Sequence, residues 1–367
     1  MDYYQIWFSV ITFYYLLILY GFIRYSYKSD NLNNITAFSA LLFVFIHIFI
    51  FLVLMNQEVA LRIFMVPLWL LILGIPPVLI TIIMLISTLF VNVYNRTSNR
   101  DISSLGKELE RKKQNWSKAK RDTHRKINHI LIFIGLVLVW YIGLFIAQHY
   151  TGSSVGMIPE ENNMLLLYFR LVMVSNSIIE VLFSLGWFYY ILFFFYYVFS
   201  LFMLANEFAR KANNLSFPFT FFTKIYLSEK EIQNYGTYMF FAIGQMFAAF
   251  TCPPMVFFTI LGIGSISDLV TSQIGIRLGK THIFWNKSKT WEGTIAGTLV
   301  TLAIAFLFVG LFWALIFTFA FLVFDLFTDK PINLSDNLLI PIGCSLLFLF
   351  VRFFFDLDYY TIIIFWI

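Results

Sequence analysis

The run TIAGTLVTLAIAFLFVGLFWALIFTFAFLVFDLF, residues 294–327, holds one charged side chain, Asp325, in 34 residues. Because about 20 apolar residues suffice to cross the hydrocarbon core of a bilayer, this run is long enough for one tilted helix or for two short helices joined near Gly310. Strict alternation of polar and apolar residues is absent, which argues against membrane β-strands. We therefore expect an all-α membrane protein.

The composition extends this expectation to the whole chain. Of the 367 residues, 60% are hydrophobic and only 12% are charged, which is typical of a polytopic helical membrane protein. Backbone polar groups inside a bilayer must bond within their own segment, so apolar runs fold as helices. Counting by length predicts a transmembrane bundle of roughly nine or ten membrane helices. The apolar runs are 4–23, 35–55, 63–90, 127–148, 164–183, 185–204, 236–257, 258–274, 294–327 and 338–355.

A basic segment divides the chain into three parts. Residues 92–126 contain eleven of the 25 Lys and Arg side chains but four acidic ones, so the positive-inside rule predicts a cytoplasmic loop. Residues 1–91 form the N-terminal membrane helices, and residues 127–367 form a second transmembrane domain. Two later basic loops, 206–235 and 277–289, are expected on the same cytoplasmic side.

The segment SDLVTSQIGIRLGKTHIFWNKSKTWEG, residues 267–293, interrupts the apolar pattern. Asp268 lies in apolar surroundings, where a carboxylate is costly and points to function. It is suited to holding a divalent ion or to accepting a proton from a substrate hydroxyl. Gly275 and Gly279 are four residues apart and share a helix face, so the pair serves either close helix packing or the approach of a ligand.

The end of that segment predicts a phosphate site. Lys287, Lys289 and Thr290 come just before a helix that we expect to begin near residue 294, and helix N-termini bind phosphate groups. The lysines add point charges. Glu292 is placed to pair with a lysine or to bind Mg²⁺. The alternative is an ordinary capped helix start with an acidic first turn.

Two further patches stand at the starts of membrane helices. Arg125 and His129 are four residues apart on one helix face, with Lys126 beside them; the alternative is a set of basic side chains that snorkel to the membrane boundary. Asp336 and Asn337 precede the last apolar run, where the alternative is helix capping.

Taken in order, these patches resemble the CTP-dependent polyprenol kinase family, which includes dolichol kinase, phytol kinase and the fungal-type CTP-dependent diacylglycerol kinase. The resemblance covers the chain from about residue 125 onward, and Ser267 stands where the family usually has glycine. The residues that carry it are Arg125, Lys126 and His129, then Asp268, Gly275, Gly279 and Lys280, then Lys287, Lys289, Thr290, Glu292 and Gly293, and finally Asp336, Asn337, Leu338 and Pro341.

The resemblance implies that the γ-phosphate of CTP is transferred to the hydroxyl of a long-chain, dolichol-like polyprenol, giving polyprenyl phosphate and CDP. The active site would face the cytoplasm from a prokaryotic plasma membrane or the endoplasmic reticulum, with the polyprenol, CTP and the bilayer as partners and no nucleic acid. Catalysis is expected of Asp268, Lys289 and Glu292, and Mg²⁺ binding of Asp268, Glu292 and Asp336. The residues expected to bind CTP are Lys280, Lys287, Lys289, Thr290, Gly293, Gly275, Gly279, Asp336, Asn337, Arg125, Lys126 and His129.

Two other functions remain open. Residues 289–293, with Gly297, also resemble phosphatidate cytidylyltransferase, which makes CDP-diacylglycerol from CTP and phosphatidate. That family continues to a histidine-containing signature near its C-terminus, whereas this chain has no histidine beyond His282. A transporter or scramblase would line its pathway with Glu180 and Asp325. No internal repeat supports it.

Overall fold

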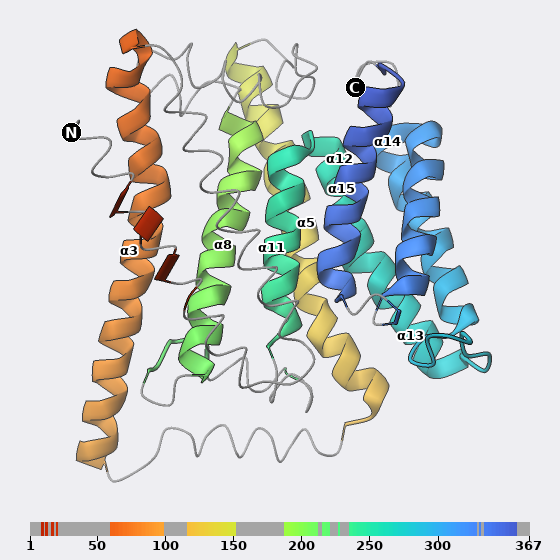
Figure 1. Cartoon of the computed structure of the whole chain (residues 1–367), viewed down its shortest axis with the longest axis horizontal. Coiled ribbons are helices and arrows are strands. Elements are labelled where there is room, and N and C mark those ends of the chain that lie inside the picture. Colours follow the sequence, from red (N-terminus) through yellow and green to blue (C-terminus); the bar gives the residue numbers. More distant parts are fainter. Residues whose placement is uncertain are drawn as a thin grey trace. The chain divides into compact units, whose positions relative to one another are not determined.

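Long apolar helices make up almost all of the chain that the computed structural model describes. The described residues are 59–98, 116–151, 187–211, 215–220, 227, 235–328, 330–331 and 334–357, with isolated positions between 9 and 20. Among them there is no β-strand, and His282 and Thr290 form an isolated bridge. The helices are α3 (Val59–Ser98), α5 (Lys118–Thr151), α8 (Trp187–Lys211), α11 (Thr237–Thr251), α12 (Pro254–Gly262), the π-helix η1 (Ile263–Ser267), α13 (Asp268–Leu278), α14 (Trp291–Phe327) and α15 (Asp336–Phe354) (Figure 1).

The helical membrane fold is confirmed, but the predicted number of helices is not. Within the described ranges, six helical segments are long and apolar enough to cross a membrane. Two predicted helices, 35–55 and 164–183, lie outside the described residues, and 4–23 is described only at isolated positions. The protein is therefore membrane-embedded, with six candidate spans in its described part.

One predicted helix boundary is wrong. The sequence pattern predicts a break between residues 257 and 258, whereas α11 ends at Thr251 and the next helix begins at Pro254. Pro253 and Pro254 lack the backbone N–H that a continuing helix needs, while proline fits the first turn of a new one. The break therefore follows the prolines rather than the apolar pattern, which runs on without interruption.

Helix α14 folds back on itself. Gly310 has φ 77° and ψ 176°, a conformation open to glycine but strained for other residues. The Thr294 hydroxyl donates to Asp325 Oδ2 at 2.6 Å across 31 residues, whereas a straight helix would separate them by about 46 Å. Residues 291–309 and 311–327 are thus two antiparallel arms, visible in Figure 1 as paired blue helices. This confirms the alternative of two short helices joined near Gly310.

The chain divides into two units, of which the first comprises residues 1–117 and 197–243. A buried polar network lies in this unit. Glu207 is fully buried and accepts hydrogen bonds from Arg210 at 3.0 and 2.6 Å and from the Tyr238 hydroxyl. The Asn206 amide donates to the same hydroxyl at 2.8 Å. This network joins the end of α8 to the start of α11.

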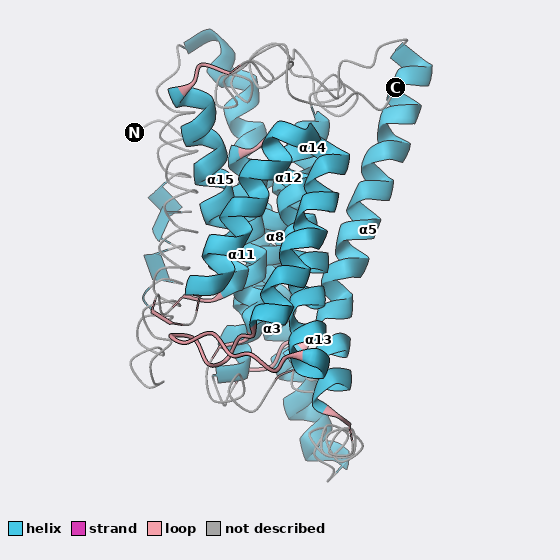
Figure 2. Ribbon diagram, turned by 90° about the vertical axis from the view of Figure 1, so that its right-hand side faces the viewer, coloured by secondary structure: helices cyan, strands magenta, loops and turns pink. Residues whose placement is uncertain are grey.

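The second unit comprises residues 118–196 and 244–367 and contains every motif named above. Its interior element is the continuous segment α12–η1–α13, which packs against α5, α14 and α15 (Figure 2). Edge-to-face aromatic contacts fill the core, as between Trp140 and Phe258, whose ring centroids are 5.8 Å apart. The packed helices bring the start of α15, the end of α14 and the loop after α13 to one end of this unit.

Candidate functional site

Glycines bring α13 into close contact with the first arm of α14. A Cβ atom on Gly293 would lie 2.6 Å from the carbonyl oxygen of Thr271, and one on Gly279 would lie 2.7 Å from the side chain of Thr290. Because such distances are far below van der Waals contact, a side chain at either position would push the two segments apart. The glycine pattern therefore serves helix packing in this structure.

The loop Gly279–Thr290, called the site loop below, turns back between these two helices. Backbone hydrogen bonds hold its shape, including one from the N–H of Ile283 to the carbonyl of Lys289 at 3.1 Å and one from the N–H of Trp291 to the carbonyl of Thr281 at 3.0 Å. The amide of Asn286 donates to the carbonyl of Thr328 at 2.6 Å and ties the loop to the end of α14. Together these hydrogen bonds fix the position of Lys289 in the loop.

The start of α14 is a capped helix N-terminus. The Thr290 hydroxyl accepts from the N–H of Gly293 at 3.3 Å. The Glu292 carboxylate accepts from the backbone N–H groups of Lys280 and Thr281 at 3.2 and 3.0 Å. Glu292 thus closes the site loop onto the helix, and the structure does not pair it with the other predicted metal ligands.

A buried ion pair joins α5 to the start of α13. Lys126 Nζ lies 2.8 Å from Asp268 Oδ1 and donates at 2.9 Å to the backbone carbonyl of the same residue. Asp268 directly follows the π-helix η1, and its N–H bonds to the carbonyl of Ile263, five residues earlier. Such π-turns occur often at functional sites. Here the π-turn immediately precedes the aspartate that Lys126 binds.

A second pair centres on Lys289. Its Nζ lies 2.5 Å from Asp325 Oδ1 and 3.6 Å from Asp336 Oδ2. Asp325 is 2% exposed, and its other oxygen accepts from Thr294. The fold of α14 at Gly310 is what returns Asp325 to the level of the site loop. Asp336, at the start of α15, is the member of this group most open to solvent.

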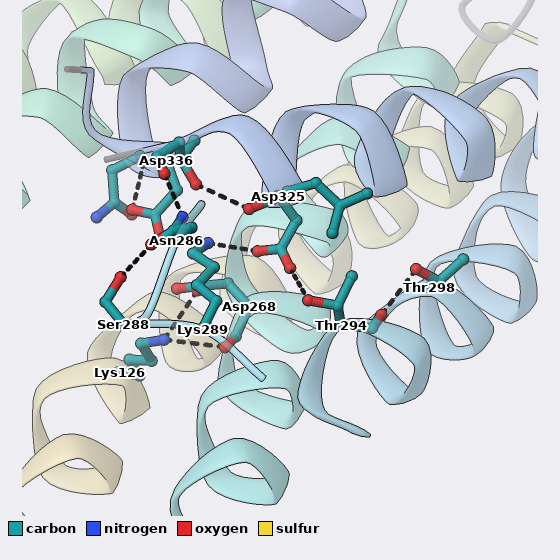
Figure 3. Close-up of polar contacts among 12 residues, drawn as sticks. Lys126, Asp268, Asn286, Ser288, Lys289, Thr294, Thr298, Asp325 and Asp336 are labelled. Carbon is teal, nitrogen blue, oxygen red and sulfur yellow. Dashed lines mark hydrogen bonds and ion pairs between the residues drawn. The ribbon is translucent and has the colours of Figure 1, made fainter. Parts of the chain in front are cut away.

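The two pairs form one electrostatic unit, the Lys/Asp cluster of Lys126, Asp268, Lys289, Asp325 and Asp336 (Figure 3). Asp268 interacts electrostatically with both Lys289 and Asp336. Burial by itself lowers the pKa of Lys289, but the carboxylates of Asp325, Asp336 and Asp268 outweigh burial and raise that pKa above its usual value. Lys289 is therefore a permanent cation at neutral pH.

A polar clamp holds α5 in place beside the cluster. Asp122 Oδ2 accepts from the Ser272 hydroxyl at 2.6 Å and from the Gln273 amide at 3.1 Å. The same amide donates to the carbonyl of Ala119 at 3.2 Å. These bonds lie about one turn before Lys126 on α5, so they set the register at which Lys126 reaches Asp268.

Four of the predicted site residues meet in the cluster: Lys126, Asp268, Lys289 and Asp336. The others lie on the same helices and on the site loop. The backbone N–H of Asn337 donates to Asp336, and His129 is buried on α5. Lys280 and Lys287 are exposed on the site loop. Arg125 lies on α5, and its side chain is outside the described part of the structure.

Asp325 is the residue that the motif analysis missed, since it entered only as a candidate for a transport pathway. The available signal was a single carboxylate in a long apolar run, with a glycine near the middle of that run. If residues 294–327 fold back at Gly310, the two ends of this run lie side by side. Asp325, near the second end, then faces Lys289, which comes just before the first end.

Two of the three predicted metal ligands, Asp268 and Asp336, belong to the cluster. In the described chain, no group of three or more His, Cys, Asp or Glu side chains is placed to hold a metal ion. Asp268 and Asp336 do interact, and Mg²⁺ is commonly bound by one or two carboxylates together with substrate phosphates.

Comparisons with protein-family models, with curated proteins and with solved structures find no match to this chain.

Proposed function

We propose that this protein is a membrane-embedded lipid kinase that transfers the γ-phosphate of CTP to the hydroxyl of a long-chain polyprenol, giving polyprenyl phosphate and CDP. The observation that carries the proposal is the Lys/Asp cluster, in which two buried lysines and three aspartates meet at one end of apolar helices. Phosphoryl transfer depends mainly on positioning and on charge stabilisation, and such a cluster supplies both.

The lysines divide into buried and exposed ones. Lys126 and Lys289 are fixed by aspartates and hold the triphosphate in one place. Lys280 and Lys287 are exposed on the site loop and attract the nucleotide from solution. The N-terminus of α14, beginning after Thr290, adds the positive end of a helix dipole on the same side.

The reaction itself requires one proton acceptor. The oxygen of the polyprenol hydroxyl forms a bond to the γ-phosphorus as the bond between that phosphorus and the β,γ-bridging oxygen breaks. The bridging oxygen leaves with the electron pair as part of CDP, and the hydroxyl proton passes to the Asp268 carboxylate. Bound Mg²⁺, held by Asp336 with the phosphates, would neutralise charge on the phosphate oxygens. Asp325 keeps Lys289 in position throughout.

The same cluster weakens the transport alternative. Both oxygens of Asp325 are occupied, one by Lys289 and the other by Thr294. A carboxylate that lines an ion or lipid pathway needs a free face, whereas this one is 2% exposed. Its partners make it a support for a lysine.

The test uses purified protein in detergent with Mg²⁺ and CTP labelled separately at the α- and γ-phosphates. A polyprenol and phosphatidate are offered side by side. The kinase proposal predicts that the γ label moves to the polyprenol while CDP accumulates. Transfer of the α label to phosphatidate with release of pyrophosphate would replace it with the cytidylyltransferase, and transfer of neither label would reject both.

A further inference from the structure

The site loop carries an exposed aromatic pair that the proposed reaction does not use. Phe284 is 90% exposed and Trp285 is 42% exposed. Both lie in the stretch between two membrane-spanning segments, one ending at Leu278 and the next beginning at Trp291. Large aromatic side chains exposed at the ends of membrane-spanning segments indicate a binding surface for a partner or for lipid.

Trp285 shows which surface the pair faces. Its indole N–H donates to the carbonyl of Leu326 at 3.0 Å, and its ring stacks on Phe327 with centroids 5.8 Å apart. Phe327 is exposed and ends the second arm of α14, whose other exposed side chains are also apolar. They are Leu311, Phe312, Leu315 and Phe319.

Trp285 therefore lies at the end of a candidate membrane-spanning segment, the depth at which acyl chains meet head groups. Tryptophan is enriched at this depth because its ring is apolar and its N–H is polar. The adjacent Phe284 has no polar group and is more exposed than Trp285.

The charged side chains within residues 277–290 are all basic. Arg277, Lys280 and Lys287 are exposed, and residues 277–290 contain no acidic side chain. Basic side chains at the membrane surface attract anionic head groups. An apolar tip flanked by lysines is the arrangement by which peripheral segments bind an anionic lipid surface.

We infer that the site loop is an interfacial anchor for anionic phospholipid, with Phe284 inserted at the acyl boundary and Lys280 and Lys287 bound to head-group phosphates. The inference rests on Phe284 and Trp285, which the proposed reaction does not use, and it gives Lys280 and Lys287 a second anionic partner besides the nucleotide. It has a consequence for the cluster: Lys289 belongs to the same loop, so the depth of Phe284 sets the level of Lys289 relative to the lipid surface.

Photocrosslinking tests the anchor directly. The full chain, with p-benzoylphenylalanine in place of Phe284, is reconstituted into vesicles of phosphatidylcholine and phosphatidylglycerol, irradiated and analysed by mass spectrometry. Lipid adducts are expected at this position and at least tenfold fewer when the same group replaces Lys120, an exposed residue on the first turns of α5. Equal yields at the two positions, or no lipid adduct at position 284, would overturn the inference.

The lysines are tested in the same preparation. Lys280→Gln and Lys287→Gln are each expected to reduce the preference of the position-284 adducts for phosphatidylglycerol by about fivefold. Both side chains are exposed, so thermal unfolding of the variants should match that of the parent. An unchanged lipid preference in the doubly substituted protein would show that the lysines do not bind head groups.

Discussion

Lys289 is a cation buried between carboxylates, and each partner depends on the other. Its Nζ contacts Asp325 at 2.5 Å and Asp336 at 3.6 Å, and only Asp336 is appreciably open to water. Removing one member of such a pair leaves an uncompensated charge in a region that water reaches poorly, whereas removing both members can be nearly neutral. The energetics of the cluster are therefore best measured by paired substitutions.

Lys289→Met and Asp325→Asn are each expected to lower the free energy of unfolding by about 3 kcal/mol. The doubly substituted protein should recover much of that loss, because neither charge then remains unpaired. Thermal unfolding in detergent, followed by intrinsic fluorescence, measures all four members of the cycle. Additive losses in the double variant would mean that the two side chains do not interact.

The raised pKa of Lys289 predicts a pH dependence with a definite sign. Because this pKa is higher in the folded protein than its ordinary value of about 10.4, the lysine contributes fully to stability below that pH. The contribution is lost as the pH rises from there through the folded-state pKa. The difference in Tm between the parent and Lys289→Met should thus stay constant from about pH 6 to 9 and shrink only above about pH 10.4. A difference that shrinks between about pH 6 and 9 would contradict the raised pKa.

Asp268→Asn is expected to reduce phosphoryl transfer at least 100-fold while leaving the protein folded, because the amide cannot accept the hydroxyl proton. Asp122→Asn is the matched control, since Asp122 also binds α13 but lies outside the cluster. It should keep most of the activity. Transfer rates with labelled CTP measure both variants, and full activity in Asp268→Asn would remove this residue from the mechanism.

Four of the five charged residues of the cluster could be predicted from the sequence as site residues, but their pairing could not. Lys126, Asp268, Lys289 and Asp336 could be predicted because charged side chains at the edges of apolar runs are costly and conspicuous. Their pairing could not, because it depends on helices up to 142 residues apart in sequence. Asp325 was missed for the same reason, since only the fold of α14 brings it to Lys289.

At the scale of elements, two glycines decide whether the helices can meet. Gly293 places the first arm of α14 against α13, where a Cβ would lie 2.6 Å from a backbone oxygen. Gly310 reverses the direction of α14. The glycine spacing on α13 could be read from the sequence, but its purpose could not, because packing and ligand approach require the same small residue.

Gly293→Ala is expected to destabilise the protein by about 1–3 kcal/mol, since the atom it meets is backbone and cannot rotate away. Gly135→Ala provides the control: Gly135 lies in α5, and a Cβ there would meet nothing within 4 Å. Thermal unfolding of the two variants should separate them clearly. Equal effects would indicate that α13 and α14 are not in close contact.

Gly310→Ala is expected to cost about 1–3 kcal/mol and to abolish transfer, because the strained backbone at this turn would misplace Asp325. Gly310→Asn should not rescue the protein. Asparagine tolerates the left-handed helical region, but ψ 176° lies outside that region. Unfolding temperature and transfer rate are measured together, and a fully active Gly310→Ala would contradict the turn.

For the whole molecule, composition alone established a helical membrane protein, while the arrangement of the helices followed from contacts that no local pattern encodes. The pairing of Lys126 with Asp268 places the basic start of α5 at the same end of the second unit as the α13 segment that leads into the site loop. The sequence predicts this end to be cytoplasmic.

Sidedness follows as a prediction. The test uses two variants, Lys120→Cys and Lys287→Cys, each at an exposed position. The native cysteines, Cys252 and Cys344, are buried and should not react. In sealed vesicles of uniform orientation, a membrane-impermeant maleimide should label both introduced cysteines from the cytoplasmic side only. Labelling of the two from opposite sides would contradict the common end.

The most direct test of the central claim is the binding of Mg²⁺-CTP to the purified doubly substituted protein, Lys289→Met with Asp325→Asn. This variant removes the cation together with its nearest carboxylate, and the carboxylate that loses a cation, Asp336, is the one most open to water, so the variant should unfold close to the parental temperature. If the Lys/Asp cluster is the phosphate site, equilibrium binding of labelled CTP should weaken at least 100-fold, as expected for the loss of a buried, charge-assisted phosphate contact. Parental affinity in the folded variant would show that the nucleotide binds elsewhere.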